Sequence, residues 1–284
     1  KKLNIFNVNF SSLSIDKENI EEYLLKICVD NSISKIPFVY IDPARRAKTG
    51  CRLKGIEDYE PNILSFLEIL YKYSDKIIVK ISPMEDISTI FNSLPSIEKI
   101  DIVSVNNECK ELLLFISNPI SKEYDNLLLS AINITPEYKQ VTEFSIYQER
   151  EAIVKYMSDE SLLEHYLYDP NSSILKSGGF KIISQLFSIE KLDKNTHLYS
   201  SKNYISDFPG RIFKIEEVIE FKSKNINNLY KNYPKANIIS KNLPFNSQSL
   251  KQRLRIDDGG DIYIFGCTIN LSKKLLICKR LNNF

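Results

Sequence analysis

The chain has 284 residues, 43% of them hydrophobic, with 38 Lys+Arg against 36 Asp+Glu and a formal net charge of +2. This length suits two or three domains, each large enough to bury a core. No apolar run approaches the ~20 residues that a membrane-spanning helix needs. We therefore expect a soluble globular protein without a membrane partner.

The cysteines indicate a reducing compartment. They stand at positions 28, 51, 109, 267 and 278, an odd number without any Cys-x-x-Cys pair. This spacing argues against a disulfide framework and against a zinc site, so we expect a cytoplasmic protein without a bound metal. The two histidines, His165 and His197, also stand apart from other metal-ligating residues, and we interpret both as structural.

Charge is distributed unevenly along the chain. Residues 211–284 carry 14 Lys+Arg against 6 Asp+Glu, a net charge of +8, so the remainder carries −6. A basic C-terminal module on an acidic body favours a polyanionic partner such as RNA. A lysine-rich solvated surface explains the same composition and stays open as the alternative.

Strands and helices alternate in the first part of the chain. Residues 1–10 predict a short strand with Asn9 at its end, and residues 16–30 carry apolar side chains at helical spacing. The apolar run at 38–41 predicts a buried parallel strand. Proline cannot extend a strand ladder, so this strand ends at Asp42-Pro43. In open α/β sheets the carboxyl ends of the strands form the edge where ligands bind.

Six further elements follow before residue 135. They are a helix at 60–74 with Pro61 in its first turn, a buried strand at 76–81, a helix at 86–94, strands at 100–105 and 111–116 joined through Asn106-Asn107, and a strand at 126–134. This order predicts the second half of a Rossmann-like sheet, with an antiparallel pair after the parallel strands.

The rest of the chain divides into two modules. Residues 136–207 predict a strand at 143–147, a helix at 148–157, an aromatic turn region at 164–171 and a helix at 173–187. Gly178-Gly179 inside that last helix costs helix stability and suggests close packing. The final module predicts the order βαβαββ, with strands at 212–221, 235–241, 261–269 and 273–279 and helices at 222–233 and 247–255.

Four blocks in order carry a family resemblance: YIDPARR at 40–46, IEDYEPN at 56–62, VKISPMEDI at 79–87 and NECKEL at 107–112. The step Asp42-Pro43-Ala44-Arg45 resembles the fourth motif of class I S-adenosylmethionine-dependent methyltransferases. Together the blocks resemble bacterial methyltransferases with a C-terminal THUMP-like domain. The resemblance implies a ferredoxin-like middle domain, whose exit matches NTHLYS at 195–200.

The resemblance sets the expected architecture, which is α/β plus α+β. We expect the C-terminal half of a Rossmann-like methyltransferase sheet at 1–135, a ferredoxin-like domain at 136–207 and a THUMP-like domain at 208–284. A class I enzyme also needs a glycine-rich turn after its first strand, and the eight glycines here never form a G-x-G pattern. The chain is therefore expected to be a fragment that lacks the main cofactor motif and roughly one upstream subdomain.

Asp42 and Pro43 are the predicted catalytic residues. In the related enzymes an Asp or Asn side chain and a following carbonyl accept hydrogen bonds from the target amine and orient it toward the methyl group. The resemblance further implies that Asn9 and Asp42 contact S-adenosylmethionine. A helix N-cap is the structural alternative for Asp42.

Arg45 stands where the related enzymes carry an aromatic residue that stacks on a base, and this departure puts base amine methylation in doubt. A guanidinium can stack on a base or grip a phosphate, so we predict Arg45 as catalytic and Arg46 as substrate-binding. Alternatively, the two form a surface pair with Glu57, Asp58 or Glu60.

Lys80 ends a buried strand and is expected either to bind substrate or to pair with an acid such as Glu57. Covalent pyrimidine methylation would need a cysteine near a strand end, and Ser82 occupies that place. Cys109, in the expected hairpin, reads as a small hydrophobic residue, so we reject the covalent route. Of the basic residues in the last module, Lys241, Arg253 and Arg255 are predicted to bind RNA, next to aromatic residues.

The sequence thus predicts part of an S-adenosylmethionine-dependent methyltransferase, directed at tRNA or rRNA, that is inactive as a fragment. Two alternatives stay open: a non-catalytic RNA-binding or scaffold protein on a methyltransferase-like fold, and a methyltransferase for DNA or a small molecule.

Overall fold

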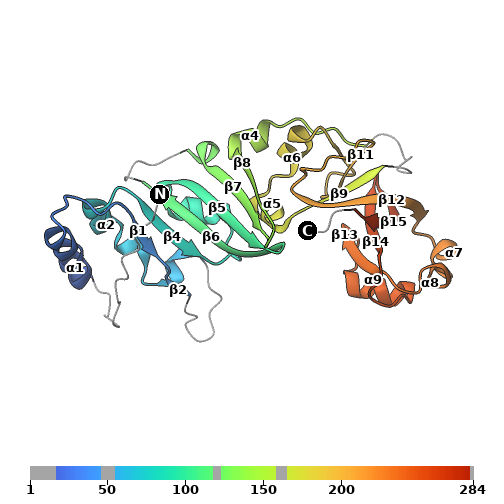
Figure 1. Cartoon of the computed structure of the whole chain (residues 1–284), viewed down its shortest axis with the longest axis horizontal. Helices are drawn as coiled ribbons and strands as arrows, with labels where there is room; N and C mark the ends of the chain where they lie inside the picture. The colour runs from blue at the N-terminus through green and yellow to red at the C-terminus, as the bar shows by residue number, and fades with distance from the viewer. Residues whose placement is uncertain (1–16, 46–54, 118–122, 158–164, 282–284) are drawn as a thin grey trace. The chain divides into compact units, whose positions relative to one another are not determined.

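A computed structural model describes residues 17–45, 55–117, 123–157 and 165–281 (Figure 1). The chain forms two compact units, one made of residues 1–99 and 113–124 and the other of residues 100–112 and 125–284. The predicted strand at 1–10, Asn9 and Arg46 lie outside the described residues.

The first unit contains the predicted strand before Asp42. Helix α1 (Lys17–Asp30) precedes strand β1 (Val39–Ile41), and β1 pairs in parallel with β4 (Ile77–Ile81), with Val39 opposite Ile77 and Ile41 opposite Val79. The parallel pairing is as predicted. Burial of β1 on both faces is not found among the described residues, because the Phe38 and Tyr40 side chains on either side of Val39 are half exposed.

The predicted helix at 60–74 begins later than expected. Strand β2 (Ala44–Arg45) pairs with β3 (Tyr59–Glu60), which follows the 3₁₀ turn η1 (Ile56–Asp58) and keeps residue 60 extended. The Asn62 side chain then accepts a hydrogen bond from the Leu64 amide and starts the turn η2 (Ile63–Ser65), which leads into α2 (Leu67–Tyr73). Pro61 therefore precedes the helical segment instead of lying in its first turn.

Helix α3 (Ile87–Ser93) follows β4 as predicted. The Asp86 carboxylate accepts a hydrogen bond from the Thr89 amide at 2.9 Å and caps the helix. Strands β5 (Ile97–Val105) and β6 (Glu108–Ile116) form a hairpin in which Asn106 and Asn107 both have positive φ, as a tight turn of this kind requires. The turn η3 (Tyr124–Asn126) and strands β7 (Leu128–Ile134) and β8 (Lys139–Ser145) complete a six-stranded sheet of order β1-β4-β6-β5-β7-β8.

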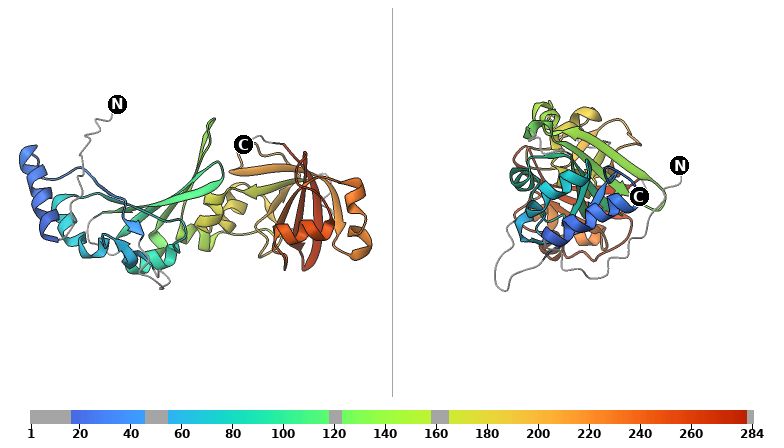
Figure 2. Two further views of the ribbon diagram at one scale, coloured as in Figure 1. Left: turned by 90° about the horizontal axis from the view of Figure 1, so that it is seen from below. Right: turned by 90° about the vertical axis from the view of Figure 1, so that its left-hand side faces the viewer.

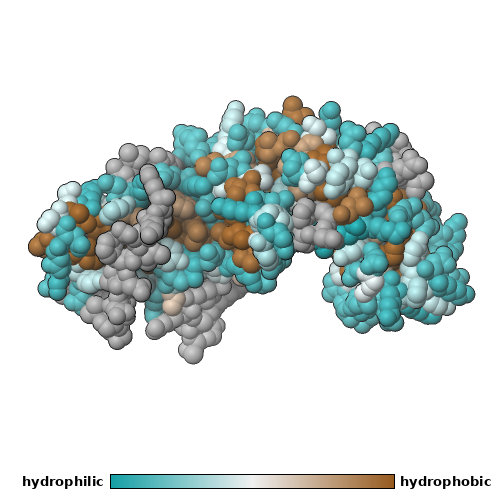
Figure 3. Space-filling model, in the orientation of Figure 1, coloured by the Kyte–Doolittle hydropathy of each residue, from teal (hydrophilic) through white to brown (hydrophobic). Residues whose placement is uncertain are grey.

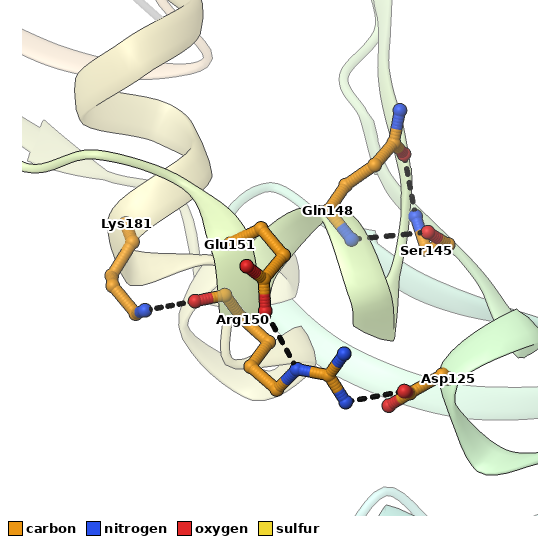
Figure 4. A network of polar contacts seen from close by, with 6 residues as sticks. All are labelled: Asp125, Ser145, Gln148, Arg150, Glu151 and Lys181. Carbon is orange, nitrogen blue, oxygen red and sulfur yellow. Dashed lines mark hydrogen bonds and ion pairs between the residues drawn. The ribbon is translucent and has the colours of Figure 1, made fainter.

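Strand β8 ends earlier than predicted, because Ser145 caps helix α4 (Ile146–Glu151). Its hydroxyl accepts from the Gln148 amide at 3.1 Å, and the Gln148 side chain accepts from the Ser145 amide at 2.8 Å (Figure 4). Arg150, one turn further, pairs with both Asp125 and Glu151, and its carbonyl accepts from Lys181. This network ties α4 to the segment before β7 and to the next helix pair.

Glycines break the predicted helix at 173–187 into two. Helix α5 (Ser172–Ser177) ends at Gly178 in the left-handed conformation, and α6 (Phe180–Leu186) starts after Gly179. A Cβ at Gly179 would lie 2.7 Å from the Phe144 ring, so the expected close packing is confirmed at Gly179, whereas a Cβ at Gly178 would meet nothing within 4 Å. The aromatic turn predicted at 164–171 is instead largely strand β9 (Tyr166–Pro170).

The modules after residue 165 share one seven-stranded sheet of order β10-β11-β9-β12-β15-β14-β13 (Figure 2). Its other members are β10 (Glu190–Lys191), β11 (Tyr199–Ser201), β12 (Gly210–Glu220), β13 (Asn237–Lys241), β14 (Ile262–Ile269) and β15 (Ser272–Arg280). β9 pairs antiparallel with β12, so the sheet continues across residue 207, where we placed a domain boundary. The predicted boundaries at 135 and 207 stay predictions.

The predicted βαβαββ order of the last module is confirmed. Its first helical segment consists of two single turns, α7 (Ser223–Ile226) and α8 (Leu229–Asn232), and its second is α9 (Ser247–Leu254). Leu250 and Leu254 of α9 pack with Ile264 of β14 in a buried cluster, which fixes α9 against the sheet (Figure 2).

Candidate functional site at the ends of β1 and β4

The carboxyl ends of the two parallel strands bring Asp42 and Lys80 together. Asp42 directly follows β1 and Lys80 lies near the end of β4, and the Lys80 Nζ is 2.5 Å from Asp42 Oδ2. Their side chains are 49% and 31% exposed respectively, so the pair lies at the surface of this edge. β2 follows Asp42, not a helix, so the helix-cap alternative for Asp42 is wrong.

The buried side chain of Tyr59 hydrogen-bonds to the turn that follows β4. The Tyr59 hydroxyl donates to Glu85 Oε1 at 3.2 Å and accepts from the Ser82 amide at 3.1 Å. Tyr59 is 2% exposed and Glu85 is 8% exposed, so the hydroxyl fixes the turn after β4 from the interior. Pro43 is also buried and holds the chain as it leaves β1. We did not predict Tyr59; its place in the IEDYEPN block was the available signal.

Lys80 pairs with an acid, which is one of the two roles expected for it. The acid is Asp42, because the parallel register places the two strand ends side by side, whereas we gave Glu57 as the example. Arg45 lies in β2, two residues after Pro43. Asp42, Pro43, Arg45 and Lys80 thus belong to the first unit, whereas Lys241, Arg253 and Arg255 belong to the second.

The basic residues of the last module fall into different environments. Lys241 Nζ lies 3.0 Å from the buried carboxylate of Asp169, so it takes part in an internal ion pair. The Arg253 guanidinium lies 5.4 Å from the Phe221 ring and 5.8 Å from the Phe245 ring, in contact with both by cation–π geometry. Arg255 is exposed and ends α9 in the left-handed conformation.

The surface around α7, α8 and α9 is largely hydrophilic (Figure 3). The exposed basic side chains among the described residues of this module are Lys222, Lys224, Lys231, Lys235, Arg253, Arg255, Lys273 and Lys279. Of these, Lys222 pairs with Glu220 and Lys279 pairs with Glu216, so two of the charges are partly compensated. Proteins that bind single-stranded nucleic acid combine basic side chains with aromatic rings for charge neutralisation and stacking, and here Arg253 lies beside two partly buried rings.

The two histidines have structural surroundings, as predicted. His165 Nδ1 lies 3.1 Å from the Ser200 hydroxyl, and the His197 ring stacks on Phe180 with centroids 3.7 Å apart. Burial, followed by the nearby charges of Lys191 and Lys241, lowers the pKa of His197 to about 4. His197 is therefore neutral at physiological pH.

Cys109, Cys267 and Cys278 are poor nucleophiles because burial favours the protonated thiol. Cys28, Cys109, Cys267 and Cys278 form no disulfide with one another. Burial raises the pKa of Cys109 and raises that of Cys267 to about 12, so both carry a proton at neutral pH. This agrees with our rejection of a covalent pyrimidine mechanism.

The described residues contain neither a metal-binding cluster nor a membrane-spanning helix. No group of three or more His, Cys, Asp or Glu side chains there is arranged to hold a metal ion. Among the helices in the same part of the chain, none combines the length and apolar character that crossing a bilayer requires.

Comparison with known families identifies the two C-terminal domains. Residues 166–209 match a family of ferredoxin-like domains, and residues 210–280 match a THUMP domain-like family. The chain therefore contains a ferredoxin-like domain followed directly by a THUMP-like domain, as the sequence resemblance predicted. No curated protein matches the chain.

The fold is shared with a solved structure. A crystal structure of a candidate methyltransferase from Porphyromonas gingivalis W83 is similar over 93% of this chain, with a TM-score of 0.82 and 32% sequence identity. The chain spans 63% of that protein's length. The predicted fold class, α/β plus α+β with ferredoxin-like and THUMP-like domains, is confirmed.

Proposed function

We propose that this chain is the C-terminal part of an S-adenosylmethionine-dependent methyltransferase that acts on RNA. The observation that carries the proposal is the half-exposed Asp42 carboxylate at the carboxyl edge of two parallel strands, in a fold shared with a candidate methyltransferase. Open α/β sheets bind their ligands at this edge.

The residues present suit the acceptor side of methyl transfer. S-adenosylmethionine, when bound, supplies a methyl group on a positively charged sulfur. Asp42 would accept a hydrogen bond from the target amine, and the Pro43 carbonyl would accept a second. The lone pair of the amine nitrogen then points at the methyl carbon. Transfer of the methyl group would release a neutral thioether as leaving group, and the amine proton would pass to solvent.

Lys80 is a positioning residue in this scheme. Its ammonium contacts Asp42 Oδ2, which leaves Oδ1 as the acceptor that can face a substrate. In-line displacement depends mainly on proximity and orientation, so a rigid acceptor is the contribution expected from the protein. The Tyr59 hydroxyl holds the adjacent turn through the Ser82 amide.

The main donor-binding motif is not found in this sequence. The eight glycines form no G-x-G turn that could approach the cofactor. Because the chain spans 63% of the similar protein, we place the donor-binding turn in the rest of a longer protein. Activity is accordingly expected of the full-length protein and not of this part alone.

RNA is the proposed substrate class because of the THUMP-like domain and the charge of the last module. Residues 211–284 carry 14 Lys+Arg against 6 Asp+Glu, and Arg253 and Arg255 are exposed there. Phosphate neutralisation releases counterions, so binding should weaken steeply as salt rises.

The test uses the full-length protein with radiolabelled S-adenosylmethionine and three acceptor pools: total RNA, genomic DNA and a small-molecule extract. We expect label in the RNA alone. Label in DNA or small molecules would contradict the RNA assignment but not methyl transfer. An intact protein that binds RNA but neither binds S-adenosylmethionine nor labels any pool would support the scaffold alternative.

A further inference from the structure

A polar pocket in the second unit stands apart from the strand-end site in the first. It has a volume of about 320 Å³ and is lined by the hairpin tip of β5 and β6, by β7, the turn before β8 and β8 itself, and by the ends of β9, β12 and β15. Its lining side chains include five amides, at Asn106, Asn107, Asn133, Gln140 and Asn171, together with Arg211 and Arg280. A volume of at least about 300 Å³ is typical of small-ligand sites.

Three of these amides have their oxygen atoms committed to the protein. Asn107 Oδ1 accepts from the Ser172 amide at 2.7 Å, Asn133 Oδ1 from the Asn107 amide at 3.1 Å, and Asn171 Oδ1 from the Ile174 amide at 3.1 Å. Each donor is a backbone N–H, which can only donate, so the orientation of every amide is fixed. The group left to face the pocket is therefore the NH₂ in all three cases.

Two of the three are almost fully buried. Asn133 is 4% exposed and Asn171 is 3% exposed, and within the described ranges neither NH₂ group donates to another protein atom. Neither NH₂ nitrogen is among the described buried side-chain atoms that lack a partner, so both reach the open space of the pocket, where an acceptor from outside the chain can meet them.

Positive charge beside the pocket favours the same kind of ligand as the NH₂ donors, one with negatively charged acceptor atoms. Arg211 and Lys241 both pair with the single buried carboxylate of Asp169, which leaves one net positive charge beside the pocket. Burial raises the pKa of the Tyr138 hydroxyl, so that lining group also keeps its proton. A ligand with several acceptor oxygens and negative charge fits these surroundings.

We propose that this pocket binds a nucleotide through its phosphate group. The amide NH₂ groups and the guanidinium of Arg211 would donate to phosphate oxygens, and the volume leaves room for the attached nucleoside. The chemistry is the same for a free mononucleotide and for a nucleotide within an RNA chain. The proposal does not depend on methyl transfer at Asp42.

The test replaces an NH₂ donor with a carboxylate oxygen while the capping bond is kept. Asn171→Asp still caps α5, because aspartate caps helices as well as asparagine does. Asn246→Asp is the matched control: Asn246 caps α9 through the Ser249 amide at 2.9 Å and is exposed outside the pocket. Asn133→Asp is a second pocket variant, and thermal unfolding verifies that each variant is folded.

Binding is measured by isothermal titration calorimetry of the full-length protein with two probes, uridine 5′-monophosphate and a short single-stranded oligoribonucleotide. We expect at least a tenfold loss of affinity for Asn171→Asp and Asn133→Asp, and none for Asn246→Asp. Binding of the mononucleotide identifies a free nucleotide as ligand, and binding of the oligoribonucleotide alone identifies RNA. No binding of either probe, or equal binding by wild type and a folded pocket variant, would overturn the proposal.

Discussion

The chain contains two Asp-Pro steps at the ends of short apolar runs rich in aromatic residues, and their surroundings differ. Asp42 follows β1 with its side chain 49% exposed and pairs with one lysine. Asp169, in β9, has a side chain that is 2% exposed and pairs with both Arg211 and Lys241. The same local sequence thus yields a surface acceptor in one unit and a buried anchor in the other.

The difference in burial predicts different effects of substitution at the two aspartates. A half-exposed ion pair contributes little to folding, because water screens its charges and solvates them when the pair breaks. A buried carboxylate with two cations is costly to disrupt, because removal of the acid leaves unmatched charge. We therefore expect substitutions at Asp169 to act on the fold and substitutions at Asp42 to act on activity.

The largest expected loss of stability follows Asp169→Asn. The side chain keeps its shape but leaves Arg211 and Lys241 without their acid, which should cost about 3 kcal/mol of unfolding free energy. Urea denaturation of wild type and variant gives the difference. Asp75→Asn, which breaks the exposed pair with Lys35, is the control and should cost less than about 1 kcal/mol. Equal losses for the two variants would contradict the comparison.

Gly210→Ala should have the second largest effect, a loss of about 2–3 kcal/mol of unfolding free energy. A Cβ at Gly210 would lie 2.3 Å from the Asp169 carbonyl oxygen, so β12 and β9 would have to move apart. Gly178→Ala is matched to it, because a Cβ there meets nothing within 4 Å and only the positive φ of 75° is penalised, at about 1 kcal/mol. Thermal unfolding of the two variants should rank them in this order, and the reverse order would refute the close approach.

The free energy of unfolding should depend on pH between 4 and 6.5 because of His197. The folded pKa of about 4 lies below the ordinary value of 6.5, so between these values the unfolded chain binds more protons than the folded one. Stability should then fall as pH drops from 6.5 to 4, by up to about 2 kcal/mol from this residue. A His197→Gln variant should lack that part of the slope. An unchanged slope in the variant would show that His197 titrates normally.

The smallest expected effect on stability belongs to Asp42→Asn, at less than about 1 kcal/mol, since the pair with Lys80 is partly exposed. Urea denaturation of Asp42→Asn and Asp169→Asn, each compared with wild type, measures the two losses of unfolding free energy. A loss of 3 kcal/mol or more at Asp42 would make it a structural anchor like Asp169.

Local signals allowed much of the fold to be predicted. Proline after Asp42 ended β1, adjacent asparagines marked the β5–β6 turn, and hydrophobic periodicity gave the order of the last module. The signals failed where pairing is distant in sequence. β9 was read as a turn because its proline suggested an end, yet it pairs with β12, and Arg211 reaches Asp169 from 42 residues away.

The candidate site residues also divide into those that local sequence predicts and those that only the fold brings together. The strand-end residue Asp42 was predictable, because a strand, a proline and a charged residue are adjacent in the sequence. Pairing of Lys80 with an acid was expected, but the identity of that acid was not, since only the parallel register places Lys80 beside Asp42. The amide-lined pocket had no local signal, because Asn107, Asn133 and Asn171 come from three separate elements. Only the fold brings them to one cavity.

The most direct test is the single-turnover rate of methyl transfer to RNA by the full-length protein carrying Asp42→Ala. If Asp42 orients the acceptor, the rate should fall at least about 100-fold while affinity for S-adenosylmethionine changes little. Asp75→Ala, which removes another exposed, lysine-paired carboxylate, should leave the rate unchanged. An Asp42→Ala protein that is folded and transfers methyl groups at the wild-type rate would contradict the account.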